Sequence, residues 1–79
     1  MKLPRDLSGA QLIKVLCRDF DYRRIHQVGS HVVLETSTPR QHRISVPDHQ
    51  WLRLGTLNGI LRAVAAAKGI TKDEIVDRL

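Results

Sequence analysis

The sequence predicts an α+β fold in the order helix, three antiparallel strands, helix, with a short extra helix at the C-terminus. Two segments repeat apolar residues every three or four positions, as amphipathic helices do, and the stretch between them is rich in β-branched residues broken at two turn-forming points. Connections of two and five residues between the strands allow only hairpins, because a parallel crossover needs a dozen or more residues. The helices should therefore gather on one face of an antiparallel sheet.

The first helix is predicted to begin at Ser8 and to end near 19–21. The Ser8 hydroxyl can accept the backbone N–H of Gln11 while the Gln11 side chain reaches back, which is the capping-box pattern. The apolar stripe of this helix consists of Leu12, Ile13, Leu16, Cys17 and Phe20. With no second cysteine available for a disulfide, Cys17 is interpreted as a small core residue.

Three short strands are predicted over residues 22–28, 31–36 and 42–46, separated by Gly29-Ser30 and by residues 37–41. In the third strand, Ile44 and Val46 alternate with polar residues, so one face should pack and the other should face solvent. The first strand alternates poorly. Pro47, which has no N–H to donate, is expected to close the sheet.

A second helix is predicted to open near residues 55–56 and to end at Lys68-Gly69, where lysine and glycine form a C-cap signal. Thr71 and Glu74 repeat the capping-box pattern and predict a short third helix. The loop before the second helix carries Trp51, interpreted as a packing anchor. We expect a single domain over residues 1–79, with 71–79 as a helical appendage. The order of elements matches the double-stranded-RNA-binding-domain fold, which does not by itself establish a function.

The composition favours a basic, soluble domain with nucleic acid as a candidate partner. Thirteen Lys and Arg against eight Asp and Glu give a formal charge of +5, and the pI is about 10.2. Residues 1–62 contain ten basic and five acidic residues and so carry all of this excess. Nine of the thirteen cations are arginine, which forks onto phosphate oxygens. A basic surface that merely keeps the protein soluble explains the same numbers.

Several classes of protein are not expected from this chain. No apolar stretch approaches the roughly 18 residues that a membrane span needs, and residues 1–6 do not resemble a secretory signal, so a cytoplasmic location is expected. A chain of this size has little room for an enclosed cofactor pocket beside a core, so no cofactor is expected.

All four histidines fall within residues 26–49, and His31 is the strongest catalytic candidate among them. It follows Gly29-Ser30 at the start of a predicted strand, where Ser30 places a hydroxyl beside the imidazole. Histidine changes charge near neutral pH and can take a proton from a ribose 2′-hydroxyl, so RNA cleavage is open to it without a metal. A strand histidine held by a backbone hydrogen bond remains the alternative. The histidine spacings fit no common zinc pattern.

Three segments resemble the HicA-type toxins of bacterial toxin–antitoxin systems. They are Gly29-Ser30-His31 at the start of the second strand, Val46-Pro47-Asp48-His49 at the exit of the third, and the helix opening Gly55-Thr56-Leu57-Asn58-Gly59-Ile60-Leu61. With the first-helix core, the resemblance covers about residues 8–70. The family motif commonly continues with a polar residue and an aromatic one after the histidine, whereas apolar residues 32–34 follow here.

The resemblance implies a small mRNA interferase on a double-stranded-RNA-binding-like fold, active without metal and neutralised by a HicB-type antitoxin. By motif match, His31 takes the catalytic role, as general base on the 2′-hydroxyl. The expected partners are mRNA and the antitoxin, with no membrane and no small-molecule cofactor. The expected RNA-contacting residues are Ser30, Arg24, Arg40, Arg43 and His49. The leaving 5′-oxygen would be protonated by water or by a second group such as His49.

Two other classes of function stay open at this stage. One is a non-catalytic RNA-binding module that reads the shape of A-form RNA through basic groups. The other is an adaptor whose basic face serves an acidic protein partner. A co-purifying partner does not separate the toxin from the adaptor, because both would have one.

Overall fold

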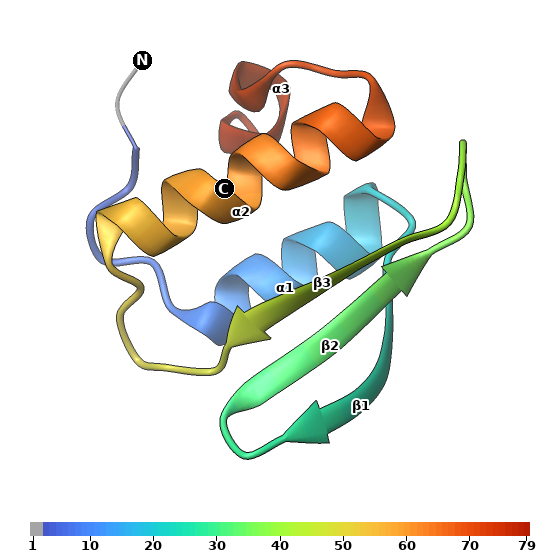
Figure 1. Cartoon of the computed structure of the whole chain (residues 1–79). Coiled ribbons are helices and arrows are strands. Elements are labelled where there is room, and N and C mark those ends of the chain that lie inside the picture. The colour runs from blue at the N-terminus through green and yellow to red at the C-terminus, as the bar shows by residue number, and fades with distance from the viewer. Residues whose placement is uncertain (1–2) are drawn as a thin grey trace.

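The computed structural model describes residues 3–79, and its elements follow the predicted order (Figure 1). The elements are α1 (Gly9–Asp19), β1 (Arg23–Val28), β2 (His31–Thr36), β3 (His42–Pro47), α2 (Leu54–Lys68) and α3 (Lys72–Val76). The three strands form one antiparallel sheet in the order β1-β2-β3. The predicted α+β fold with its short extra helix is therefore confirmed.

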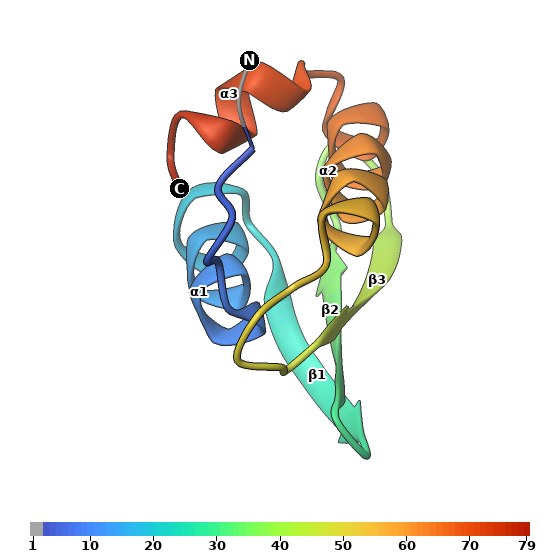
Figure 2. The same cartoon turned by 90° about the vertical axis from the view of Figure 1, so that its left-hand side faces the viewer.

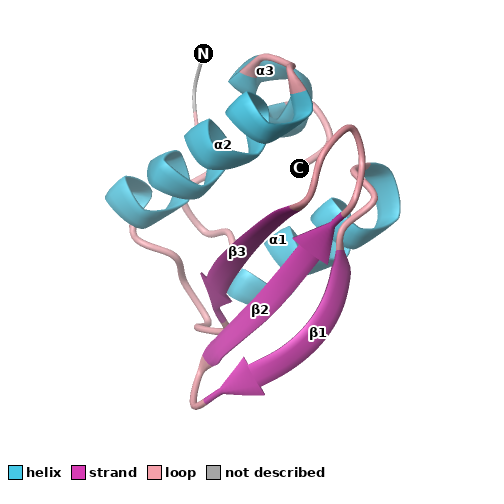
Figure 3. Cartoon of the chain, turned by 45° about the vertical axis from the view of Figure 1, so that its right-hand side comes forward, coloured by secondary structure: helices cyan, strands magenta, loops and turns pink. Residues whose placement is uncertain are grey.

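Both long helices lie on one face of the sheet and leave the other face open. Figure 2 shows α1 and α2 side by side above the strands, with α3 crossing over them at the far end from the β1–β2 turn. Figure 3 shows the sheet in front of the helices. The sheet therefore has a helix-covered face and an open face, and these two names are used below.

The core lies between the two helices and the covered face of the sheet. Leu12 and Leu16 of α1 and Leu57 and Leu61 of α2 have no exposed surface, and Ile75 of α3 joins the same cluster. The apolar stripes of the sequence are thus the buried faces of the helices, each such leucine contributing on the order of 1.5–3 kcal/mol through burial. Cys17 is partly buried against this cluster, as its position in the stripe predicted.

The register of the sheet decides which side chains reach the open face. Because successive side chains alternate, Val32 and Leu34, both fully buried, point to the helices. His31 lies on the other face and pairs with Val28 of β1 and with Pro47 of β3. The open face is therefore where the candidate catalytic histidine lies.

Two details of the strands differ from the sequence expectation. The β1–β2 register shifts between Arg24 and His26, a bulge that explains why the first strand alternated poorly in the sequence. Strand β3 extends to Pro47, which was expected to follow the strand rather than belong to it. Proline is tolerated there because β3 is an edge strand with only one neighbour to satisfy.

The caps of α1 and the end of α2 match the predicted signals, whereas at α3 only the Thr71 half of the predicted capping box forms. The Ser8 hydroxyl accepts the Gln11 N–H at 3.1 Å, and the Gln11 side-chain oxygen accepts the Ser8 N–H at 2.9 Å. Thr71 accepts the Glu74 N–H at 3.3 Å, while Gly69 ends α2 in the left-handed conformation with φ 68°. No helix within residues 3–79 is both long enough and apolar enough to span a membrane.

Candidate functional site

A tight two-residue turn places His31 at one end of the open face. Gly29 adopts φ 58°, a left-handed conformation that glycine adopts without steric cost and that two-residue hairpin turns require. The turn joins the last residue of β1 to the first of β2, so His31 is positioned by strand pairing on both sides. His31 is exposed.

The loop after β3 brings a second histidine to the same turn. The hydroxyl of Ser30 lies 3.2 Å from Nε2 of His49. The backbone N–H of Asp48 donates to the Ser30 carbonyl oxygen at 2.6 Å, which extends the β2–β3 pairing beyond the strands. Three residues singled out from the sequence, Ser30, His31 and His49, therefore meet at one end of the sheet, and we call them the histidine corner.

The first residue of α1 contacts the loop that carries His49. The N–H of Gly9 donates to the carbonyl oxygen of His49 at 2.9 Å. A Cβ atom at Gly9 would lie 1.9 Å from the Pro47 carbonyl oxygen and 2.9 Å from the Asp48 Cα, so only glycine allows this approach. The start of α1 and the end of β3 are thus packed backbone to backbone, and the position of His49 depends on that contact.

Arg43 lies on the open face further along the sheet, in a row with two other charged residues. Glu35 of β2 pairs directly opposite Arg23 of β1 and Arg43 of β3. One Glu35 carboxylate oxygen accepts from Arg23 at 3.0 Å and the other from Nε of Arg43 at 2.7 Å. The hydrogen bond from Arg43, and a further one from Gln41, lower the pKa of Glu35. The row keeps one net positive charge, about 13 Å along the strand from His31.

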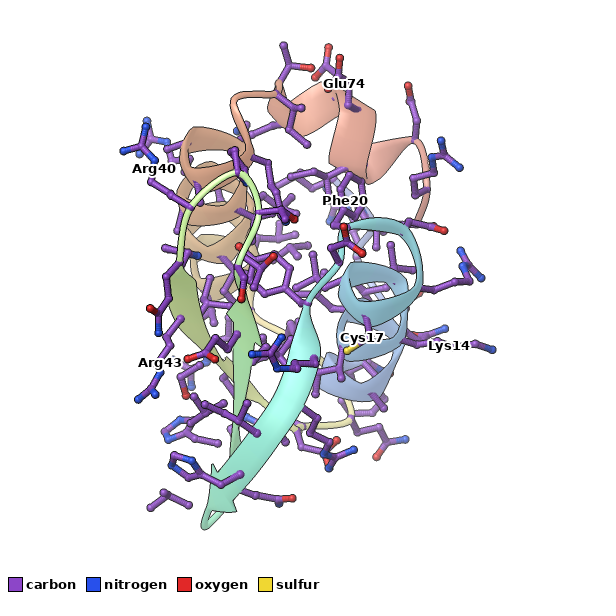
Figure 4. All side chains as sticks on the ribbon, turned by 90° about the vertical axis from the view of Figure 1, so that its right-hand side faces the viewer. Lys14, Cys17, Phe20, Arg40, Arg43 and Glu74 are labelled. Atoms are coloured by element: carbon purple, nitrogen blue, oxygen red, sulfur yellow. The ribbon has the colours of Figure 1, made fainter. Side chains whose placement is uncertain are left out.

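The other two arginines proposed from the sequence lie away from the histidine corner. Arg24 is paired with Leu34, whose side chain faces the helices. Burial raises the pKa of the Cys17 thiol on α1, and the charge of Arg24 partly offsets that rise, which places Arg24 on the covered side of β1. Arg40 lies at the tip of the β2–β3 loop, at the opposite end of the sheet (Figure 4).

His42 has a structural setting instead of a place in the histidine corner. It pairs with Thr36, five residues and about 17 Å along β2 from His31. Its Nδ1 lies 2.8 Å from the hydroxyl oxygen of Tyr22. Burial raises the pKa of Tyr22 to about 12, so this hydroxyl stays protonated in its hydrogen bond with the imidazole. The Lys68 ammonium lies 5.0 Å from the centre of the same tyrosine ring.

One sequence interpretation is wrong. Trp51 was taken as an anchor that packs the loop before α2, but 63% of its surface is exposed. The anchor is its neighbour Leu52, which is 4% exposed and donates its N–H to the Leu7 carbonyl oxygen at 2.8 Å. A tryptophan beside a leucine in an irregular loop gives no periodicity from which to tell which of the two points inward.

Two features of the site had no clear signal in the sequence. The role of Gly9 depends on a contact between segments about forty residues apart, which no local pattern reveals. Glu35 could have been paired with Arg43 only by knowing the strand register. Within residues 3–79, no three His, Cys, Asp or Glu side chains gather closely enough to hold a metal ion.

A helix, three antiparallel strands and a helix, with both helices on one face, make this a small α+β domain of the double-stranded-RNA-binding-like layout. A family model described as HicA toxin of bacterial toxin–antitoxin matches residues 9–65. The chain therefore belongs to the HicA toxin family, which confirms the resemblance carried by its motifs. A toxin of this kind implies an antitoxin partner. Comparisons with curated proteins and with solved structures gave no match.

Proposed function

We propose that the protein is an mRNA-cleaving endoribonuclease that acts without a metal ion, as the toxin partner of a HicB-type antitoxin. The observation that carries the proposal is the histidine corner, where the exposed His31 adjoins Ser30 and the Ser30 hydroxyl contacts His49. Two imidazoles at one end of the sheet, His31 on its open face and His49 in the loop after β3, supply an acid and a base near neutral pH. Cleavage of mRNA also accords with a cytoplasmic site of action.

In the proposed reaction, His31 accepts the proton of a ribose 2′-hydroxyl as that oxygen attacks the adjacent phosphorus. The new O2′–P bond forms while the P–O5′ bond breaks, and protonated His49 gives its proton to the leaving 5′-oxygen. The products are a 2′,3′-cyclic phosphate and a 5′-hydroxyl end. The Ser30 hydroxyl, 3.2 Å from Nε2 of His49, orients that imidazole.

Arg43 is the arginine best placed to hold the RNA backbone on the same face. Its contact to Glu35 uses Nε alone, and 61% of its side chain is exposed, so its two terminal nitrogens are open to a phosphate. Arg24 and Arg40 would contact only RNA that extends around the edge of β1 or past the β2–β3 loop.

The test is cleavage of end-labelled RNA by purified protein in the presence of EDTA. His31→Ala should lower the cleavage rate by about 10²- to 10⁴-fold, the usual contribution of a general base. Thermal unfolding should be nearly unchanged because His31 is exposed. His26→Ala is the matched control, since His26 is an exposed histidine paired with Val33 on the same face.

Three results would contradict the proposal. Full activity of His31→Ala would remove the catalytic role of that residue. Loss of cleavage in EDTA with recovery on adding a divalent cation would replace the metal-free mechanism. RNA that is bound tightly but never cut by the wild-type protein would indicate a non-catalytic RNA-binding module.

A further inference from the structure

Trp51 is the most prominent aromatic group that the fold does not use. It is the single tryptophan of the chain, and 63% of its surface is exposed. Tyr22, by contrast, is 3% exposed and bonded to His42. Burying a tryptophan ring removes roughly 150–250 Å² of surface from water. Most of this surface is not buried in the core and is available to a binding partner.

The loop that carries Trp51 is fixed on both sides of it. His49, two residues before, accepts a hydrogen bond from the N–H of Gly9 at 2.9 Å. Leu52, one residue after, is buried and donates to the Leu7 carbonyl oxygen at 2.8 Å. The backbone around Trp51 is therefore held by Leu7 and Gly9, just before and at the start of α1, and the ring is exposed on an anchored segment.

The position of Trp51 relates it to the histidine corner. Two residues of chain span at most about 7 Å between Cα atoms, so the Trp51 backbone lies within that distance of His49. His49 in turn contacts Ser30, the neighbour of His31. RNA that reaches the histidine corner would therefore pass close to the loop that carries the indole.

The surroundings of Trp51 favour a nucleobase over an apolar protein surface. Its neighbours Gln50 and Arg53 are polar and exposed. Arg53 makes no side-chain hydrogen bond or ion pair with residues 3–79, so its charge is available to a phosphate. An exposed aromatic face beside a cation can stack a base of single-stranded nucleic acid, whereas the bases of an A-form duplex are stacked on each other.

We infer that Trp51 is a stacking platform for an unpaired nucleobase of the RNA, and that the substrate is single-stranded where it meets the histidine corner. This inference rests on the proposed function and adds to it the class of substrate and a residue that positions it. Trp51 takes no part in the proton transfers. It acts by holding the nucleotide next to the cleaved bond in place.

The test uses the His31→Gln protein, which keeps RNA intact during the measurement. Because Trp51 is the only tryptophan, its fluorescence reports on the loop directly, and adding single-stranded RNA should quench it. In the same background, Trp51→Leu should raise the Kd for labelled single-stranded RNA by between about 5-fold and about 150-fold. The slope of log Kd against log salt should not change, because no charge is removed.

Two further variants make the measurement specific. Trp51→Phe keeps an aromatic face and should recover part of the affinity, which leucine, apolar but not aromatic, should not. Leu54→Ala alters another exposed apolar residue, 43% exposed at the start of α2, and should leave the Kd unchanged. Circular dichroism of each variant checks that the fold is kept.

The outcomes separate this inference from the proposed function. If Trp51→Leu binds single-stranded RNA within about twofold of its parent while the wild-type enzyme cleaves RNA, the stacking role is overturned and the ribonuclease stands. If Trp51→Leu keeps its RNA affinity but loses binding to the antitoxin, the ring is a protein contact and the inference is overturned as well. If the wild-type protein cleaves no RNA while Trp51 dependence is seen in binding, the platform stands and the catalytic proposal fails.

Discussion

Replacing Gly9 with alanine is expected to destabilise this protein, although the same change stabilises the interior of most helices. The added Cβ would lie 1.9 Å from the Pro47 carbonyl oxygen, whereas real Cβ atoms keep at least 3.0 Å from such neighbours. The start of α1 and residues 47–49 must therefore separate by about 1 Å, as overpacked segments do. That movement stretches the 2.9 Å hydrogen bond from Gly9 to His49 beyond a useful length.

The expected magnitude follows from these two losses. Overpacking costs about 1–3 kcal/mol, and the lost backbone hydrogen bond about 0.5–1.5 kcal/mol. The higher helix propensity of alanine stabilises the fold by up to about 1 kcal/mol and offsets part of this loss. The net loss in the free energy of unfolding is about 0.5–4.5 kcal/mol, and the middle of that range, about 2.5 kcal/mol, lowers Tm by roughly 10–20 °C in a domain of this size.

The matched control is Gly59→Ala, measured by the same thermal and urea unfolding. Gly59 lies inside α2, where an added Cβ meets nothing within 4 Å. Its replacement should raise the stability by about 0.5–1 kcal/mol. The same glycine-to-alanine substitution should thus change the stability in opposite directions at the two positions. That difference isolates the effect of the close approach between Gly9 and residues 47–48. If Gly9→Ala is as stable as the wild type, residues 47–49 move aside with no loss in the free energy of unfolding, and α1 does not fix the position of the histidine corner.

Two further predictions concern polar contacts at the other end of the sheet. Tyr22→Phe removes the hydroxyl that bonds His42 at 2.8 Å, and urea unfolding should show a loss of about 1 kcal/mol. The hydrogen bonds from Arg43 and Gln41 lower the pKa of Glu35 in the folded protein. The ionised carboxylate therefore stabilises the fold at pH values above its ordinary pKa of about 4.3, and this stabilisation is lost as the pH falls through the lower pKa of the folded state. Glu35→Gln should therefore flatten the acid limb of a stability–pH curve below about pH 4.3; an unchanged limb would assign acid unfolding to other groups.

The sequence predicted the elements well because their signals are local. The capping box at Ser8 and the glycine that ends α2 at Gly69 involve residues within one helical turn, and both form as expected. The turn at residues 29–30 is equally local, so His31 was correctly placed at the start of a strand. Short-range sequence signals of this kind predict the observed structure when the tertiary contacts favour the same local conformation.

The candidate site was less predictable because sheet register and loop packing assemble it. Clustering in the sequence put all four histidines together, yet strand length separates His42 from His31 by about 17 Å. Conversely, Gly9 and His49 are distant in the sequence and bonded in the structure. Pairing with β2 also places Arg24, opposite Leu34, and Arg43, opposite Glu35, on different faces of the sheet, which composition alone could not reveal.

The histidine corner is held by contacts that span the whole chain, and this decides how its variants must be interpreted. His49 is positioned through Gly9 of α1, and His31 through pairing with β1 and β3. Unfolding of any of these elements removes the site, so a destabilising change elsewhere lowers activity in proportion to the folded fraction. His31→Ala should instead lower the cleavage rate by about 10²- to 10⁴-fold at full stability. Activity measured per folded molecule therefore falls for His31→Ala and for Gly9→Ala, which displaces His49, and stays unchanged for a destabilising change away from the histidine corner.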